Sequence, residues 1–149
     1  IGGRTVSKGT VINFFVGRAF DGEPLTVYEP GDQSRNYVHV DDVARAYLHS
    51  TDRLLAQLDR GETGVERYEI ASDEDPGVMT VAELVQTAAG EEAGIDVDIS
   101  LVENPRAGET LVTEFGVDTS RARDVLGWEP ERSVEESVRD LVRTKAAQD

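Results

Sequence analysis

The fold is decided by one stretch of the sequence, Gly31-Asp-Gln-Ser-Arg35-Asn-Tyr37-Val-His39-Val40. Polar and apolar residues alternate over 33–40, which predicts a strand with Arg35, Tyr37 and His39 on one face and the valines on the other. The planar guanidinium of an arginine matches the oxygens of a phosphate, so the polar face is a candidate anion-binding surface. The spacing also allows a plainer alternative, an exposed arginine paired with one of the chain's many carboxylates.

On either side of this stretch, helical and strand patterns alternate, which favours an α/β fold over an all-α or all-β one. Further strands are predicted over 25–28, 67–71 and 95–102. Helices are predicted over 10–20, 41–58, 80–90 and 118–126, and a last one from 133 onward. The pair Asp41-Asp42 and two capping boxes, at 80–83 and 133–136, mark three of the helix starts.

Two of the predicted helices carry apolar residues at helical spacing, which is typical of a helix that packs on a core. In the first helix these residues are Val11, Phe14, Phe15 and Ala19, and in the last helix they are Val134, Val138, Leu141 and Val142. Trp128 lies between the last two helices in sequence and is expected to anchor them.

A second arginine, Arg106, lies in the loop Asn104-Pro-Arg-Ala-Gly-Glu109. Two arginines that converge on one diphosphate would form a clamp, and Glu109 could accept hydrogen bonds from a ribose. The alternative is a solvated loop with no ligand. No metal site is expected, because the two histidines, His39 and His49, do not have a recognised ligand spacing.

The composition excludes several classes of protein. The 149 residues include 30 acidic and 15 basic ones, for a net charge of -15, so nucleic acid and anionic membranes are not expected partners. No cysteine is present, which excludes a disulfide framework and a thiol nucleophile. No leader or membrane-spanning run is visible. The lack of cysteine leaves the redox compartment open, and we expect a reducing cytoplasm as the simpler interpretation. Only two lysines accompany thirteen arginines, a balance typical of salt-adapted proteins.

Four stretches together resemble a known family. They are Gly22–Tyr28, Gly31–Ala46, Asp118–Ala122 and Leu126–Pro130, and they resemble, in order, the C-terminal half of NAD-dependent nucleotide-sugar epimerases and dehydratases. These enzymes, which include UDP-glucose 4-epimerase, form the extended short-chain dehydrogenase family. The sequence departs from the family pattern at Asn36, where an aspartate is usual.

The resemblance implies a fold and a site. The chain would be the C-terminal substrate-binding part of an α/β enzyme, with a strand and helix that complete a Rossmann sheet whose first half is absent. Residues 41–71 would pack against that N-terminal Rossmann domain. The implied nucleotide-sugar ligands are Arg35 and Arg106 on the pyrophosphate, Tyr37 close to the phosphates, Glu109 on the ribose, Leu25 to Val27 along the base, and Val11 nearby.

The resemblance also implies an activity. The chain would be the nucleotide-sugar-binding portion of an NAD(P)-dependent nucleoside-diphosphate-sugar 4-epimerase. A 4,6-dehydratase or a uronate decarboxylase of the same family is the alternative, and a non-catalytic acidic binding module is an alternative of another class. Catalytic and cofactor-binding residues would lie in the N-terminal half, so this segment alone is expected to be inactive. A homodimer is expected of the full-length protein.

Overall fold

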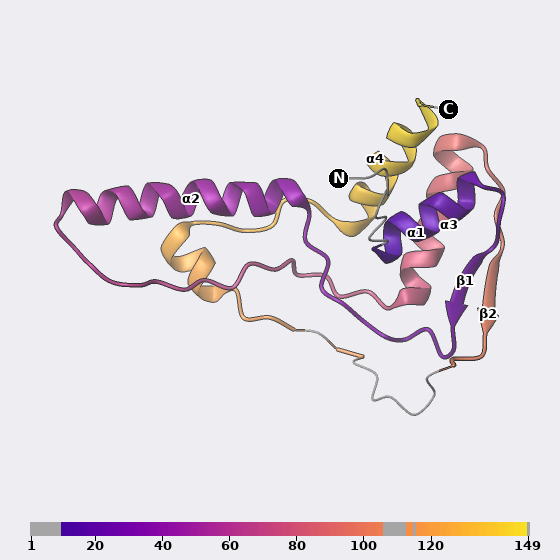
Figure 1. The fold of residues 1–149 in the computed structure, drawn as a ribbon, viewed down its shortest axis with the longest axis horizontal. Coiled ribbons are helices and arrows are strands. Elements are labelled where there is room, and N and C mark those ends of the chain that lie inside the picture. Colours follow the sequence, from indigo (N-terminus) through magenta and orange to yellow (C-terminus); the bar gives the residue numbers. More distant parts are fainter. Residues whose placement is uncertain (1–9, 106–112, 115, 149) are drawn as a thin grey trace, which may run out of the picture. The chain divides into compact units, whose positions relative to one another are not determined.

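A computed structural model describes residues 10–105, 113–114 and 116–148, and in it the chain divides into two compact units. Unit 1 comprises residues 1–33, 77–111 and 138–149, and unit 2 comprises residues 34–76 and 112–137. Figure 1 shows the elements of both units, and each unit is described by itself below.

Unit 1 is built on two helices and a two-stranded sheet. Its helices are α1 (Val11–Phe20) and α3 (Val78–Ala93), and its strands are β1 (Leu25–Tyr28) and β2 (Ile99–Val102). The strands are parallel, with Leu25 opposite Ile99. The predicted α1 and β1 are therefore confirmed, while β2 is shorter than predicted because only 99–102 pair with β1.

The core of unit 1 lies between α1, α3 and β1, which contact one another. Phe15, Val16 and Ala19 of α1 are buried there, but Phe14 is 46% exposed. The prediction that Phe14 shares the buried face was therefore wrong. Val16 follows Phe15 on the buried side instead.

Helix α3 does not begin at the predicted capping box over 80–83. It begins at Val78, with Gly77 as its N-cap, because the first helical N–H groups have acceptors in the sequence-distant turn at 31–33. The N–H of Val78 donates to the carbonyl oxygen of Gln33, and that of Met79 to the carbonyl oxygen of Gly31. The helix ends at Ala93 rather than at residue 90, and its C-cap Gly94 adopts the left-handed conformation.

Unit 2 contains the long helix α2 (Val40–Asp59) and the short π-helix η1 (Ala122–Leu126). Asp118 caps the turn before η1 by accepting the Ser120 N–H, and Gly127 ends it in the left-handed conformation, as predicted. The N-cap of α2 is His39, whose Nδ1 accepts the N–H of Asp41. The prediction that Asp41-Asp42 caps this helix was therefore wrong, because both residues lie in its first turn.

Trp128 fills the core of unit 2 and is fully buried. It clusters with Ala46 of α2 and with Ala122 and Leu126 of η1, and its Nε1 donates to the carbonyl oxygen of Asp42. Trp128 therefore packs against η1, as predicted, but its other helical partner in this cluster is α2 and not the last helix.

The last helix, α4 (Val134–Ala146), begins at the predicted capping box. The N–H of Glu136 donates to Oγ of Ser133, and the N–H of Ser133 donates to the Glu136 carboxylate, both at 3.1 Å. Three members of the predicted apolar stripe, Val134, Val138 and Val142, are buried.

The strands predicted over 33–40 and 67–71 are not observed. Both segments lack the regular pairing of a strand, apart from an isolated bridge at Ser34. Strand pattern in a sequence becomes a strand only when a neighbour supplies hydrogen bonds, and the described residues offer no such neighbour to either segment. The prediction that Val40 serves a core was also wrong, because it is 72% exposed.

Among the residues that the structure describes, no helix is both long and apolar enough to cross a bilayer.

Candidate functional site

The polar stretch 31–40 is approached through a tight turn that only glycine permits. Gly31 has φ +80°, and a Cβ there would lie 3.1 Å from Cγ1 of Val27 and 3.3 Å from Cβ of Met79. A side chain would be strained by the backbone and would also press on the neighbouring core. Gly31 therefore fixes the point at which the chain leaves β1.

Within unit 2, the side chain of Asn36 bonds to the backbone of Ser72, in the way that a neighbouring strand would. Its Nδ2 donates to the carbonyl oxygen of Ser72 at 2.8 Å, and its Oδ1 accepts the N–H of Ser72 at 3.0 Å. This two-way pattern needs a side chain that both donates and accepts, which an amide does and an ionised carboxylate does not. The departure from the family's aspartate is therefore matched by the local hydrogen bonding.

Replacing Asn36 by aspartate is expected to destabilise unit 2 by about 2 kcal/mol, because a carboxylate would face the Ser72 carbonyl and lose a donor. Urea unfolding followed by circular dichroism measures this loss. Asn13→Asp is the charge-matched control, since the side chain of Asn13 donates to Thr10 at an exposed site. Equal unfolding midpoints for the two variants would show that the hydrogen bonds between Asn36 and Ser72 do not stabilise unit 2.

Arg35 and Tyr37 flank Asn36 in the sequence and interact electrostatically. Burial raises the pKa of the Tyr37 hydroxyl, and the positive charge of Arg35 partly offsets that rise. The Tyr37 hydroxyl oxygen is buried and has no hydrogen-bond partner among the described residues. Arg35 is exposed, and no hydrogen bond or ion pair to a described residue is recorded for it.

Arg35 and Tyr37 both carry hydrogen-bond donors for which the described residues supply no acceptor. A guanidinium carries only donors, and a neutral phenol has a donor proton available. The buried Oγ of Ser34 also lacks a partner within the described part of the chain. Three such groups within four residues suit an oxygen-rich anion better than a cation.

His39 does not join Arg35 and Tyr37 on a common face, as the strand pattern predicted. Its ring nitrogen is used to cap α2. His49 is also occupied, because its Nδ1 lies 2.8 Å from the carbonyl oxygen of Leu126. No group of three potential metal ligands occurs among the described residues.

Asp42, which the sequence analysis treated only as a helix cap, is a buried and extensively hydrogen-bonded side chain of unit 2. It is 1% exposed, and its carboxylate accepts hydrogen bonds from Arg45 and from the N–H groups of Glu131 and Arg132. Burial alone would raise its pKa, but these donors outweigh burial and hold the pKa below its usual value. The sequence signal that could have indicated this role is the i, i+3 spacing of Asp42 and Arg45, which allows an ion pair on a helix.

The residues assigned to the base lie in unit 1. The side chains of Leu25 and Val27 are fully buried, so they cannot touch a ligand directly. The N–H of Leu25 donates to the carbonyl oxygen of Asp98, next to β2, and that of Glu29 donates to the carbonyl oxygen of Val102. By the alternation of a strand, the backbone groups of Thr26 therefore point away from β2. The free edge of β1 at Thr26 is therefore the part of this strand that a ligand could reach. Val11 is half-buried at the start of α1.

The structure thus groups the predicted site residues only in part. Arg35 and Tyr37 are neighbours in unit 2, whereas Val11, Leu25 and Val27 belong to unit 1. Arg106 and Glu109 lie outside the described residues. The sequence has neither a glycine-rich phosphate loop nor a Tyr-x-x-x-Lys pair.

The sequence is similar to one family of known proteins. A model of the NAD dependent epimerase/dehydratase family matches residues 3–71. The chain is 31% identical over 137 residues to UDP-glucuronic acid decarboxylase 3 of Arabidopsis thaliana, an alignment that covers 89% of this chain and 34% of that protein. It is 28% identical over 125 residues to UDP-glucose 4-epimerase of Caenorhabditis elegans, covering 78% of this chain and 32% of that protein.

The structure is also similar to solved structures of this family. The structure of UDP-glucose 4-epimerase with UDP-glucose from Thermotoga maritima matches with a TM-score of 0.72 and 25% identity, over 97% of this chain and 42% of that chain. The chain spans about a third of the length of the curated relatives it matches. The resemblance drawn from the sequence is confirmed: the chain is a relative of the NAD dependent epimerases and dehydratases and has the α/β fold of the corresponding part of those enzymes.

Proposed function

We propose that this chain is the nucleotide-sugar-binding portion of an NAD(P)-dependent nucleoside-diphosphate-sugar 4-epimerase. The observation that carries the proposal is the exposed Arg35 two residues from the buried Tyr37 hydroxyl, with no hydrogen bond or ion pair from either group to another residue that the structure describes. Both are donors, and the diphosphate of a nucleotide-sugar supplies acceptors. Arg106 would complete the clamp, Glu109 would contact the ribose, and the edge of β1 would run past the base.

Arg35→Ala is expected to weaken the binding of UDP-glucose about 10- to 100-fold, because a hydrogen bond to a charged group contributes about 1.5–3 kcal/mol. Isothermal titration of the polypeptide encoded by the complete reading frame measures this affinity. Arg60→Ala is the charge-matched control, since Arg60 is paired with exposed Glu62. Unchanged affinity in Arg35→Ala would reject the diphosphate assignment.

The redox chemistry would belong to residues outside this chain. A nicotinamide supplies hydride transfer when it is bound, and the 149 residues contribute binding and orientation of the sugar nucleotide. We propose that this segment alone has no turnover. We also propose a cytoplasmic homodimer for the complete protein.

A uronate decarboxylase is the second candidate, because the 31% identical relative is named UDP-glucuronic acid decarboxylase 3. The same diphosphate clamp would serve either reaction. Supplying the complete protein with UDP-glucuronic acid and with UDP-glucose separates them. Release of carbon dioxide from the first substrate indicates the decarboxylase, and interconversion of the second with its C4 epimer indicates the epimerase.

A further inference from the structure

The loop formed by residues 72–74 lies against Asn36 and Tyr37 in unit 2. The side chain of Asn36 bonds to the backbone of Ser72 in both directions, at 2.8 and 3.0 Å. The carbonyl oxygen of Glu74 accepts the N–H of Tyr37 at 3.5 Å and lies 3.4 Å from Nδ2 of Asn36. Loop 72–74 therefore holds the backbone at the candidate anion site.

The two ends of this loop are also bonded to each other. The Oγ of Ser72 donates to the carbonyl oxygen of Glu74 at 2.9 Å and accepts the N–H of Glu74 at 3.2 Å. Ser72 is only 7% exposed, and local serine–backbone bonds of this kind stabilise a turn. A displacement of Glu74 would therefore move Ser72, and with it the backbone that Asn36 holds.

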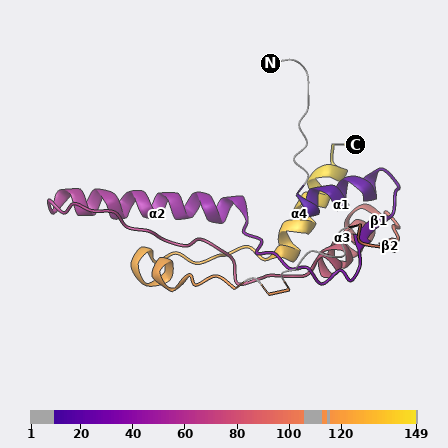
Figure 2. The same ribbon diagram turned by 60° about the horizontal axis from the view of Figure 1, so that its bottom comes forward.

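The carboxylate of Glu74 attaches the loop to the start of α4. Its Oε2 accepts the N–H of Val134, the first residue of that helix, at 2.5 Å. This N–H has no acceptor within the helix, and the helix dipole favours a carboxylate beside it. Figures 1 and 2 show the segment before α2, the segment before α3 and the start of α4 close together. Glu74 thus has its side chain on a helix and its backbone on the candidate site.

Asp73, the middle residue of the loop, is attached less firmly. Its carboxylate bonds to Nη2 of Arg123 at 2.5 and 2.7 Å, but the two side chains are 65% and 37% exposed. Exposed ion pairs of this kind contribute little to stability. The attachment of the loop to unit 2 therefore depends mainly on Glu74.

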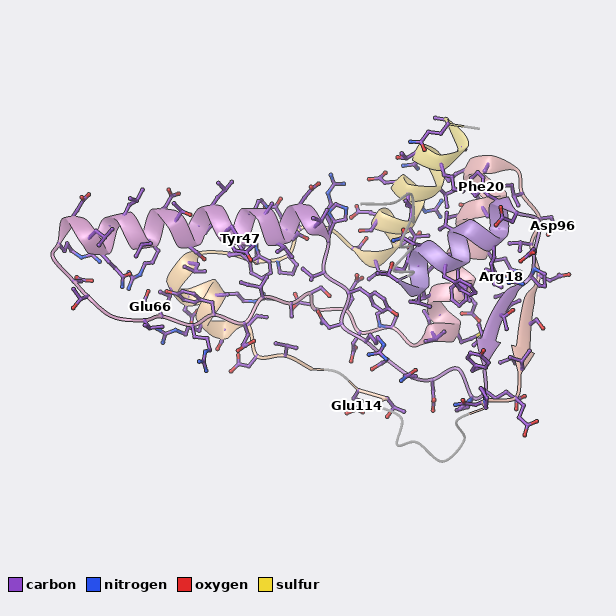
Figure 3. The ribbon with its side chains drawn as sticks, viewed as in Figure 1. Arg18, Phe20, Tyr47, Glu66, Asp96 and Glu114 are labelled. Atoms are coloured by element: carbon purple, nitrogen blue, oxygen red, sulfur yellow. The ribbon has the colours of Figure 1, made fainter. Side chains whose placement is uncertain are left out.

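Helix α2 is held in unit 2 by other residues. Its polar inner side bonds through Arg53 to Glu66, which is labelled in Figure 3. Its outer side carries large exposed apolar residues, which include Leu54, Leu55 and Leu58. The bonds of Arg53 do not reach Asn36 or Tyr37, so they leave the position of these residues to loop 72–74.

We propose that Glu74 is a positioning residue of the diphosphate site. Its carboxylate, bonded to the start of α4, fixes loop 72–74, and the loop holds Arg35 and Tyr37 in the arrangement that binds a nucleoside diphosphate. This inference deepens the proposed function, on which it rests, by naming what preorganises the same site. Glu74 itself does not touch the ligand. Preorganised donors bind more tightly because less conformational freedom is lost on binding.

Two alanine variants separate positioning of the site from capping of α4. Glu74 accepts the N–H of Val134, and Glu136 accepts the N–H and the hydroxyl of Ser133 at the same helix start. No hydrogen bond from Glu136 to 72–74 is recorded in the part of the chain that the structure describes. Glu136→Ala is therefore the matched control, because it removes a cap of α4 without touching the loop. Glu74→Gln is the conservative variant, because an amide oxygen can still accept the Val134 N–H.

Binding of UDP-glucose is measured by isothermal titration of the polypeptide encoded by the complete reading frame, at a temperature where every variant is folded. Glu74→Ala should weaken binding about tenfold, whereas Glu136→Ala and Glu74→Gln should stay within about twofold of the parent. Equal losses of affinity in the two alanine variants would overturn the proposal. A Glu74→Gln variant as weak as Glu74→Ala would also overturn it, because the hydrogen bond to Val134 would then not be what positions the loop.

Amide hydrogen exchange, measured without ligand, follows the loop directly. The amides of Tyr37 and Ser72 donate to Glu74 and Asn36, so they should exchange about tenfold faster in Glu74→Ala and at the parent rate in Glu136→Ala. A parent protein without affinity for UDP-glucose would reject the proposed function. Unchanged exchange in Glu74→Ala, together with normal binding by the parent, would reject the positioning role alone.

Discussion

Asp42→Asn is expected to destabilise unit 2 by about 3 kcal/mol, because it breaks up a buried and fully hydrogen-bonded charge. The carboxylate accepts three hydrogen bonds, from Arg45, Glu131 and Arg132. An asparagine has one acceptor oxygen, and its NH₂ group would face a backbone N–H donor. The N–H groups of Glu131 and Arg132, each of which now has its own carboxylate oxygen, would have only one acceptor oxygen between them. Urea unfolding followed by circular dichroism measures the change.

Asp41→Asn is the matched control, since Asp41 lies in the same helical turn with its side chain 67% exposed. Its unfolding midpoint should stay within about 0.5 kcal/mol of the parent, as expected for an exposed surface change. Similar losses in both variants would mean that the first turn of α2, rather than the buried carboxylate, is sensitive to charge.

The same carboxylate makes stability depend on pH. Its pKa in the folded chain is lower than in the unfolded chain, so the unfolded chain binds the proton more readily. The stabilisation is therefore complete above the ordinary aspartate pKa of about 3.9 and is lost as the pH falls through the lower folded value. Asp42→Asn should flatten this part of the pH–stability curve, and an unchanged slope below about pH 4 would contradict the assignment.

Trp128→Ala is expected to cost about 3–5 kcal/mol, the range for truncating a large buried aromatic side chain. Trp128 is fully buried against Ala46, Ala122 and Leu126, so a cavity would open between α2 and η1. The hydrogen bond to the Asp42 carbonyl oxygen would also be lost. Circular dichroism is the readout, because Trp128 is the only tryptophan and its fluorescence disappears with it.

Leu101→Ala is the control for this truncation, since Leu101 is 51% exposed. It should cost less than about 1 kcal/mol, because little buried area is lost. Amide exchange separates the two units: Trp128→Ala should loosen α2 and η1 and leave α3 unchanged. Equal loosening of both units would show that Trp128 does not act within unit 2 alone.

Local signals in the sequence predicted the elements that are held together by local interactions. The Ser133–Glu136 capping box, the stop at Gly127 and the strand at 25–28 depend on neighbouring residues or on a simple pattern, and all are observed. The strands at 33–40 and 67–71 needed a distant partner that periodicity cannot supply. The start of α3 was missed because acceptors in the turn at Gly31 and Gln33, remote in sequence, extend it backward.

In the candidate site, too, local sequence predicted some features, and others depend on residues distant in the sequence. Arg35 and Tyr37 could be selected from residue type and spacing, and they are neighbours in unit 2. Sequence spacing did not show that His39 is used as a helix cap or that Asp42 is buried, because both facts depend on which side of α2 faces the unit. The inward polar side of that helix contradicts the usual rule for reading amphipathic patterns.

The apolar outer side of α2 also determines how the folded chain would behave with the fluorescent dye ANS. Such dyes bind exposed hydrophobic surface and are used to recognise molten globules. The 149-residue chain presents Leu54, Leu55 and Leu58 to solvent while Trp128 stays rigidly packed. It should therefore bind the dye and keep a near-ultraviolet dichroism signal at once, so dye fluorescence alone would misidentify a native protein as a partly unfolded one.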